Sequence, residues 1–148
     1  MTVTIRDVTA ADRAVWDRLY AGYAAFYRVD QTAAMRDTVW GWLMDQGHKT
    51  EGLVACAADG TVIGLAHYRA FARPLSASTG GFLDDLFVDP DVRGSGAADA
   101  LIAALRGIGQ ARGWTVIRWI TADDNYRARG VYDRVAARTP WVTYDIKL

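Results

Sequence analysis

The sequence predicts one mixed α/β domain of 148 residues, built from six to seven strands and four helices in the order β-α-α-β-β-β-α-β-α-β. Three observations support this class. Apolar residues switch between a spacing of two and a spacing of three or four along the chain. The pair Asp59-Gly60 between two apolar runs is typical of a β-hairpin. A strand, a glycine turn, a helix and another strand over 82–121 indicate a parallel crossover.

Each element follows from its local pattern. Helices are predicted where apolar residues share one helical face, over 9–27, 30–47, 97–108 and 125–137. Strands are predicted where apolar residues alternate with polar ones or form short runs, over 3–8, 53–57, 62–68, 82–88, 114–121 and 141–148. The polar stretch 73–81, with one proline and two glycines, predicts a loop. Thr9 with Asp12 forms a capping box, and Asp30 or Thr32 caps the second helix. No linker or repeat interrupts the pattern, so residues 1–148 form a single domain.

Composition excludes several classes of function. Seventeen basic residues balance seventeen acidic ones, whereas nucleic-acid-binding domains usually carry a basic excess. No apolar run approaches the roughly 18–20 residues of a membrane span, and the N-terminus lacks a signal-peptide pattern. Cys56 is the only cysteine, and two histidines are too few for a zinc cluster, so we expect neither disulfide nor metal. These features predict a cytoplasmic protein that does not bind nucleic acid or membranes.

The most informative segment joins the strand Leu83–Val88 to the turn Arg93-Gly94-Ser95-Gly96 and then to a helix starting at Ala97-Ala98. The first amides of a helix lack internal partners and, together with the helix dipole, form an anion site suited to a pyrophosphate. A P-loop is excluded because no Gly-Lys-Ser/Thr occurs. The dinucleotide-binding fingerprint is excluded because Asp99 occupies the place of its third glycine.

The sequence Arg93-x-x-Gly96-x-Ala98 resembles the R/Q-x-x-G-x-G/A motif of the GCN5-related N-acetyltransferase (GNAT) superfamily. The acidic and apolar segment before it is similar to the strand that precedes the motif in that superfamily. Asn125 and Tyr132 are spaced as the asparagine and tyrosine of its next conserved segment. The C-terminal part, with Thr139-Pro140 and Tyr144, resembles a branch of small yeast histone and polyamine acetyltransferases. Ala136 departs from the glycine found there in many relatives.

This resemblance implies a GNAT-like mixed sheet and an enzyme that moves an acetyl group from acetyl-CoA to a primary amine by direct attack. The acceptor would be a polyamine, a lysine-like group on a peptide or another small amine. On this basis, the cofactor-binding residues are those of the strand, the turn and the next helix: Leu86, Phe87, Val88, Arg93, Gly94, Ser95, Gly96, Ala97, Ala98 and Asn125. A strand amide near Val88 would meet the developing oxyanion.

Two residues are the catalytic candidates. Tyr132, whose phenol stays protonated at neutral pH, would donate a proton to the leaving thiolate. Asp84 corresponds to an acidic residue that lines the acceptor site in polyamine-type relatives, and would act as base or as ammonium anchor. Strand alternation predicts that Asp84 and Asp85 face opposite sides of the sheet. The alternatives are a core tyrosine, a salt-bridged surface carboxylate and, for Asn125, a plain helix cap.

Further candidates for acceptor binding are Tyr23, Tyr27, Asp85 and His67. The two tyrosines belong to an aromatic stripe that either forms a wall for a cationic amine or fills the core. His67 is either a second base or a structural histidine.

Two other functions remain open. The acceptor could be an amino acid or a protein N-terminus, or the domain could sense acyl-CoA without catalysis. The resemblance also predicts a homodimer formed through Trp141–Leu148.

Overall fold

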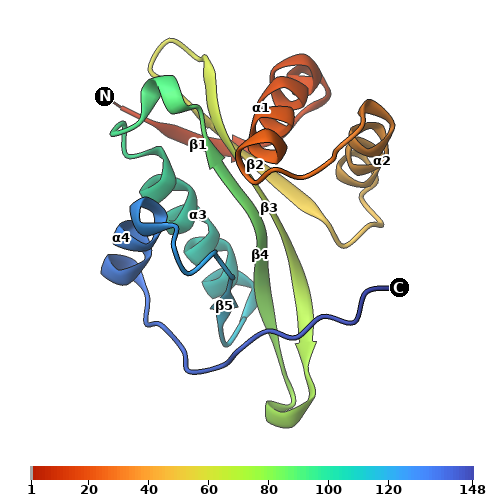
Figure 1. Ribbon diagram of the computed structural model, residues 1–148, viewed down its shortest axis with the longest axis vertical. Helices are drawn as coiled ribbons and strands as arrows, with labels where there is room; N and C mark the ends of the chain where they lie inside the picture. Colours follow the sequence, from red (N-terminus) through yellow and green to blue (C-terminus); the bar gives the residue numbers. More distant parts are fainter. Residues whose placement is uncertain (1) are drawn as a thin grey trace.

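The computed structural model describes residues 2–148 and places a five-stranded sheet between two pairs of helices (Figure 1). The strand order follows the chain, and all neighbours are antiparallel except β4 and β5. The strands are β1 (Thr4–Asp7), β2 (Glu51–Cys56), β3 (Val62–Arg73), β4 (Ser78–Val88) and β5 (Ile117–Arg118). The helices are α1 (Arg13–Phe26), α2 (Ala33–Met44), α3 (Ala97–Arg112) and α4 (Tyr126–Val135).

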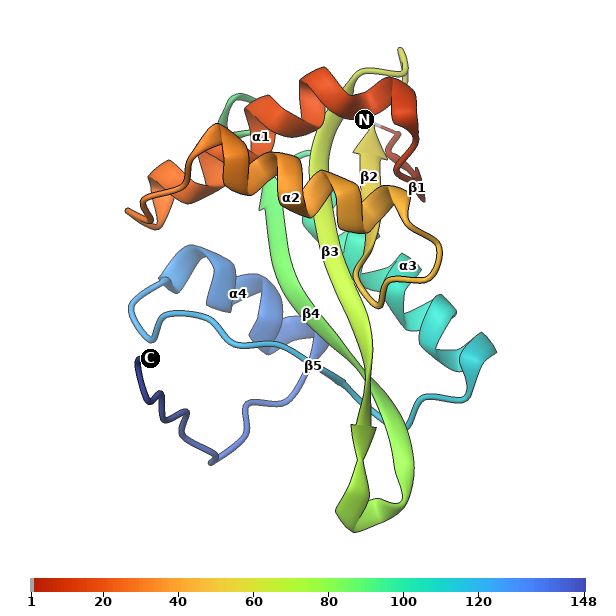
Figure 2. The same cartoon turned by 90° about the vertical axis from the view of Figure 1, so that its right-hand side faces the viewer.

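The sheet has an apolar core on each face. Helices α1 and α2 cover one face, and α3 and α4 lie on the other (Figure 2). The neighbouring residues of β2 point alternately into the two cores: Leu53 and Ala55 pack toward α3, while Val54 and Cys56 pack beneath α1. All four are buried. Because both faces of β2 are covered, this strand is apolar at every position from Leu53 onward.

The helix and hairpin predictions are confirmed. Thr9 and Asp12 form the predicted capping box, which opens a short 3-10 turn before α1. Thr32, rather than Asp30, caps α2, because its hydroxyl accepts the N–H of Met35 at 3.1 Å. The turn between β2 and β3 contains Asp59, whose carboxylate accepts the N–H of Thr61 at 3.0 Å.

The loop predicted over 73–81 is wrong. Strands β3 and β4 continue as a long hairpin that extends beyond the other strands (Figure 2), and only a 3-10 turn at Pro74–Ser76 separates them. Gly81 pairs within β4, and the ring of Trp114 occupies the place that a side chain at this position would take. The glycine therefore marks a close approach of a side chain and not a turn.

The strand predicted over 114–121 is much shorter than expected. Only Ile117 and Arg118 pair with β4, opposite Gly81 and Phe82. The chain then leaves β4 and leads to α4. From Leu83 to Val88, β4 has no partner strand on this side among the described residues. An open edge of this kind carries backbone N–H and C=O groups that can bind an extended ligand.

The predicted final strand is also wrong, so the sheet has five strands and not six or seven. The segment 136–148 is extended but pairs with no strand of the described chain, and it runs apart from the sheet (Figure 2). Its apolar side chains are exposed: Trp141, Val142, Tyr144, Ile146 and Leu148. Alternation makes a segment compatible with a strand, but a strand also needs a neighbouring edge. The dimer through this segment stays a prediction.

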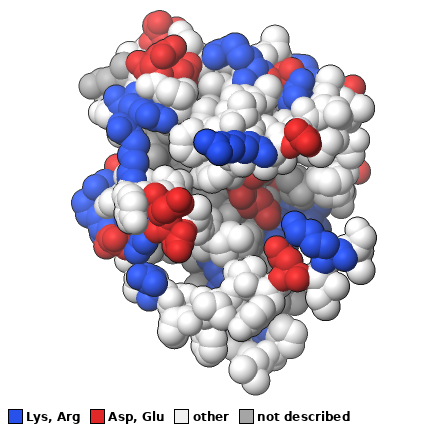
Figure 3. All heavy atoms as spheres, in the orientation of Figure 1, with Lys and Arg blue, Asp and Glu red and all other residues white. Residues whose placement is uncertain are grey.

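The surface agrees with the balanced composition. Acidic and basic side chains are interspersed over the face seen in Figure 3. Among the described residues, no helix is both long and apolar enough to cross a membrane.

Candidate active site

A β-bulge in the middle of β4 shapes the candidate active site. Opposite β3, His67 pairs with Asp85 and Tyr68 pairs with Leu83, so Asp84 is an extra residue without a partner. A bulge interrupts the alternation of side chains along a strand. Leu83 and Leu86, three residues apart, therefore pack in the same core toward α3. Asp84 and Asp85 both line one cavity on the other face. The prediction that the two carboxylates face opposite sides is wrong.

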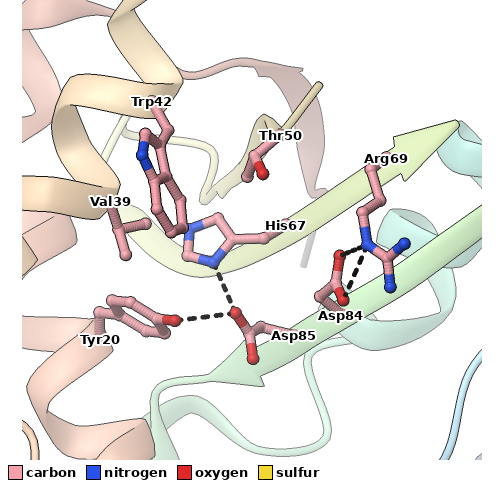
Figure 4. A pocket seen from close by; sticks show the side chains of 8 residues that line it. All are labelled: Tyr20, Val39, Trp42, Thr50, His67, Arg69, Asp84 and Asp85. Carbon is pink, nitrogen blue, oxygen red and sulfur yellow. Dashed lines mark hydrogen bonds and ion pairs between the residues drawn. The ribbon is translucent and has the colours of Figure 1, made fainter. Parts of the chain in front are cut away.

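This first cavity has a volume of about 360 Å³ and lies between α1, α2 and the two central strands (Figure 4). Its walls combine aromatic and ionisable side chains: Tyr20, Val39, Trp42, Thr50, His67, Arg69, Asp84 and Asp85. The sequence analysis identified three of these residues. Tyr20 and Trp42 belong to the aromatic residues of the first two helices, for which the sequence left a wall for the amine and core packing open, and Arg69 carries no motif that predicts it.

Asp85 is held by His67 and Tyr20. The Oδ2 atom of Asp85 lies 2.8 Å from Nδ1 of His67 and accepts the hydroxyl of Tyr20 at 2.9 Å (Figure 4). On the far side of the ring, Nε2 of His67 lies 2.9 Å from the indole nitrogen of Trp16. Trp16 and His67 are almost fully buried. Burial alone would raise the pKa of Asp85, but the interactions with His67 and Tyr20 outweigh burial and lower it.

Asp84 instead pairs with a cation. The Nε atom of Arg69 donates to both carboxylate oxygens of Asp84, at 3.1 and 3.3 Å (Figure 4). The guanidinium also lies over the ring of Phe82, 4.8 Å from its centroid. Burial raises the pKa of Asp84, and the opposing effect of Arg69 does not cancel this shift. A raised pKa brings a carboxylate closer to the range in which it accepts and releases protons.

A second, smaller cavity lies beside the open edge of β4. Its lining comes from α1, β4, the segment after β5 and α4: Tyr23, Tyr27, Leu83, Asp84, Leu86, Trp119, Ile120 and Tyr132. The ring of Tyr132 meets that of Trp119 edge-on, with centroids 5.4 Å apart. Burial, with a smaller effect of Tyr27, raises the pKa of Tyr132 to about 12, so its hydroxyl is protonated at neutral pH. Asp84 borders both cavities and lies at their junction.

The turn before α3 is open to a ligand. Gly94 and Gly96 both have φ of +83°, a conformation that favours glycine, and a Cβ built on either would meet no atom within 4 Å. Arg93 is exposed next to them. Ala97 has its N–H near the Ser95 hydroxyl at 3.3 Å, and the amides that follow start a 16-residue helix. Backbone amides, helix dipole and one arginine fit a phosphate group.

Hydrogen bonds hold helix α4 against the end of α1 and the first turn of α3. Asn125 caps α4, since its carbonyl accepts the N–H of Ala128 at 3.4 Å. Its amide donates to the hydroxyl of Tyr27 at 3.1 Å. Further along α4, Arg134 donates to Asp99 in the first turn of α3 at 2.8 Å. Asn125 is thus an N-cap of α4, and a contact with the cofactor stays a prediction.

The other predicted site residues lie around this arrangement. Phe87 points toward α1, where its ring meets that of Tyr23 edge-on at 5.7 Å, while Val88 packs toward α3. Their contribution to a ligand is therefore limited to the backbone of β4. The sequence did not predict a role for Trp16 at the site. Its partner His67 lies 51 residues away, and no local pattern predicts a hydrogen bond between them.

An open strand edge, a turn whose backbone amides fit a phosphate group, and a cavity lined by both Tyr132 and Asp84 therefore occur together along β4. Residues 16–136 match the model of the Acetyltransferase (GNAT) family, and the chain belongs to this family. It is accordingly an acetyl-CoA-dependent N-acetyltransferase, as the sequence predicted.

Individual relatives are similar over most of the chain. The D-amino-acid N-acetyltransferase HPA3 of Saccharomyces cerevisiae is 24% identical over 143 residues, which cover 96% of this chain and 89% of the yeast protein. The aminoglycoside N(6')-acetyltransferase type 1 of Stenotrophomonas maltophilia is 34% identical over 111 residues, covering 70% of this chain and 65% of that protein. The match to the yeast enzyme agrees with the predicted resemblance to small yeast acetyltransferases.

The fold is shared with solved structures. The structure of a ribosomal-protein-alanine N-acetyltransferase from Brucella melitensis biovar Abortus 2308 has a TM-score of 0.82 and 26% identity, with 99% of this chain and 100% of that chain covered. The GNAT-like fold is therefore confirmed, with a five-stranded sheet.

Proposed function

We propose that this enzyme acetylates the primary amine of a small molecule that binds in the first cavity. The observation that carries the proposal is the place of Asp84, which borders this cavity and also the second cavity, where Tyr132 lies. An amine bound beside Asp84 would have a proton acceptor next to it, and the cavity that Asp84 also borders would supply Tyr132 as proton donor. The names of two relatives, which act on D-amino acids and on aminoglycosides, support small amines as acceptors.

On the donor side, the amides from Gly94 to Ala98, with Arg93, would hold the pyrophosphate of acetyl-CoA. The open β4 edge over Leu86–Val88 would bind the pantetheine arm through backbone hydrogen bonds. The bound donor supplies an acetyl thioester, and the second cavity lies along this edge of β4. Asn125, whose amide donates to Tyr27 at the border of the same cavity, would contact the donor.

The protein contributes two proton transfers. Asp84 takes a proton from the ammonium group, directly or through one water, so that the nitrogen lone pair becomes available. The new C–N bond forms as the C–S bond breaks, and the hydroxyl of Tyr132 gives its proton to the leaving sulfur. The second proton that the nitrogen loses on becoming an amide returns through water to the phenolate of Tyr132, which restores its hydroxyl. Asp85 adds a negative charge near the cationic amine, with Tyr23, Tyr27 and His67 around the acceptor.

Direct attack is favoured over a covalent enzyme intermediate. Cys56 is 6% exposed and packs in the apolar core beneath α1. It lines neither cavity, so it cannot reach a thioester bound along the open edge of β4. A nucleophilic cysteine needs access and a neighbouring base.

The test is release of free CoA thiol from acetyl-CoA in the presence of diamines, amino acids and aminoglycosides. We expect turnover with at least one of these classes, and we expect Asp84→Asn to lower kcat by about a hundredfold because general-base catalysis is lost. Asp59→Asn, in the exposed β2–β3 turn, is the matched control and should match the wild type. Stabilisation by acetyl-CoA without thiol release across the panel would contradict catalysis and favour an acyl-CoA sensor.

A further inference from the structure

The two carboxylates of the first cavity differ in what balances their charge. Asp84 is paired with the Arg69 guanidinium. No lysine or arginine of the described chain pairs with Asp85, whose partners are Tyr20 and His67. The first cavity therefore keeps one uncompensated negative charge only if His67 is neutral. A protonated His67 would cancel this charge.

The bond from Trp16 decides the state of His67. An indole nitrogen can only donate a hydrogen bond, so Nε2 of His67 must accept it with its lone pair. An imidazole whose Nε2 accepts carries its single proton on Nδ1, which then donates to Asp85. A second proton on Nε2 would point at the indole N–H in a site from which water is excluded, because both rings are at most 2% exposed.

We propose that Trp16 is a positioning residue that keeps His67 an uncharged donor and thereby preserves the negative charge of Asp85 for the cationic acceptor amine. The inference rests on the proposed function, because it assigns the charge to acceptor binding. Trp16 reaches Asp85 only through His67 and lines neither cavity. Its effect is therefore on the charge of the acceptor site and not on the reacting atoms.

Apart from Trp16, no neighbouring group among the described residues fixes the protonation state of His67. The titratable and charged side chains that face the ring or its cavity come from α1, β3, β4 and the loop before β2: Tyr20, Tyr23, Arg69, Asp84, Asp85 and His48. Burial and the charge of Asp85 raise the pKa values of Tyr20 and Tyr23, so both remain neutral donors. Arg69 is held by Asp84, and His48 stacks on the outer ring of Trp42.

Replacing Trp16 with Phe keeps an aromatic ring but removes the indole N–H. His67 can then take a second proton on Nε2, next to the Asp85 carboxylate, and the pair becomes neutral overall. The matched control is Trp40→Phe. Trp40 packs against Trp16, with ring centroids 5.0 Å apart, and its indole N–H makes no hydrogen bond within the described residues.

Two measurements test the proposal. Side-chain ¹⁵N NMR should show wild-type His67 uncharged with its proton on Nδ1 between about pH 8 and about pH 6, and should show a charged ring at the lower pH in Trp16→Phe. Over the same range, the KM of the acceptor amine should rise at least about tenfold in Trp16→Phe. It should stay within about twofold in the wild type and in Trp40→Phe, with the KM of acetyl-CoA unchanged in all three.

A second variant, His67→Gln, tests the proposal if Trp16→Phe does not fold. In His67→Gln, the amide can accept from Trp16 and donate to Asp85 but cannot gain a proton, so the amine KM should not depend on pH. A wild-type His67 protonated on Nε2, or unchanged pH dependence in a folded Trp16→Phe, would overturn the proposal. If no amine yields CoA thiol, the proposed function fails, while the NMR comparison still decides the state of His67.

Discussion

The region beneath α1 and the turn before α3 differ in where their polar groups find hydrogen-bond partners. Beneath α1, Trp16, His67, Tyr20 and Asp85 bind one another, and Asp12 at the start of the helix binds Arg6 at 2.8 Å. At the turn, a side chain at Gly94 or Gly96 would meet no atom within 4 Å, and the N–H of Ala97 meets the hydroxyl of the neighbouring Ser95 at a long 3.3 Å. We call the first region closed because its polar groups bind one another, although Tyr20, His67 and Asp85 also line the first cavity, and we call the turn open because it presents backbone amides to solvent.

This difference predicts how each region responds to change. Removing a bond from the closed region costs stability or alters a charge, because the partner left behind stays buried. Changing the open region costs binding or turnover and leaves stability nearly intact, because no internal bond is lost. The following experiments, ordered by the size of the expected effect, test that division.

The largest effect is expected for Tyr132→Phe. The hydroxyl of Tyr132 has no hydrogen-bond partner among the described residues and lines the second cavity, so its loss, like a change in the open region, should leave stability nearly intact. Loss of the proton donor should lower kcat by about a hundredfold, with an unchanged melting temperature and acetyl-CoA KM. Tyr20→Phe is the matched change in the closed region and should cost about 1 kcal/mol in the free energy of unfolding. Equal losses of stability in the two variants would contradict the division between the closed and the open region.

Acid should act on the closed region. The hydrogen bonds from Arg6 lower the pKa of Asp12 to about 2, against an ordinary value of 3.8 in the unfolded chain. Because the folded pKa is the lower one, the stabilisation is present above about pH 4 and is lost as the pH falls toward about 2. We expect a loss of about 2 kcal/mol from this carboxylate in urea unfolding. In Asp12→Asn this part of the acid dependence should be absent; parallel losses in both proteins would exclude Asp12 as its source.

The smallest effect is expected for Gly96→Asp. A carboxylate at the start of α3 would repel the pyrophosphate and weaken acetyl-CoA binding by about tenfold, measured by calorimetry. The matched control is Gly113→Asp at the other end of the same helix, where φ is +73° and a Cβ also meets nothing. Both variants bear similar backbone strain, so only the first should affect acetyl-CoA. Equal weakening by both would assign the effect to strain and remove the turn from the donor site.

Much of the candidate site was predictable because its signals are local. The turn from Arg93 to Gly96 directly follows its strand and precedes its helix, and Asn125 and Tyr132 belong to one helix. The acceptor cavity was only partly predictable. Tyr20, Trp42 and Arg69 come from three separate elements, and nothing in their own segments distinguishes them from core or surface residues.

The amino-acid sequence by itself determined the helices, the β2–β3 hairpin and the turn before α3, because each depends on side chains within a few residues of one another. The tertiary structure alone decided the rest. The bulge that turns Asp84 and Asp85 to one face depends on the register between β3 and β4. The early end of β5 and the unpaired segment 136–148 depend on which strand edges are within reach. The neutral state of His67 depends on Trp16, a residue that only folding brings within 2.9 Å.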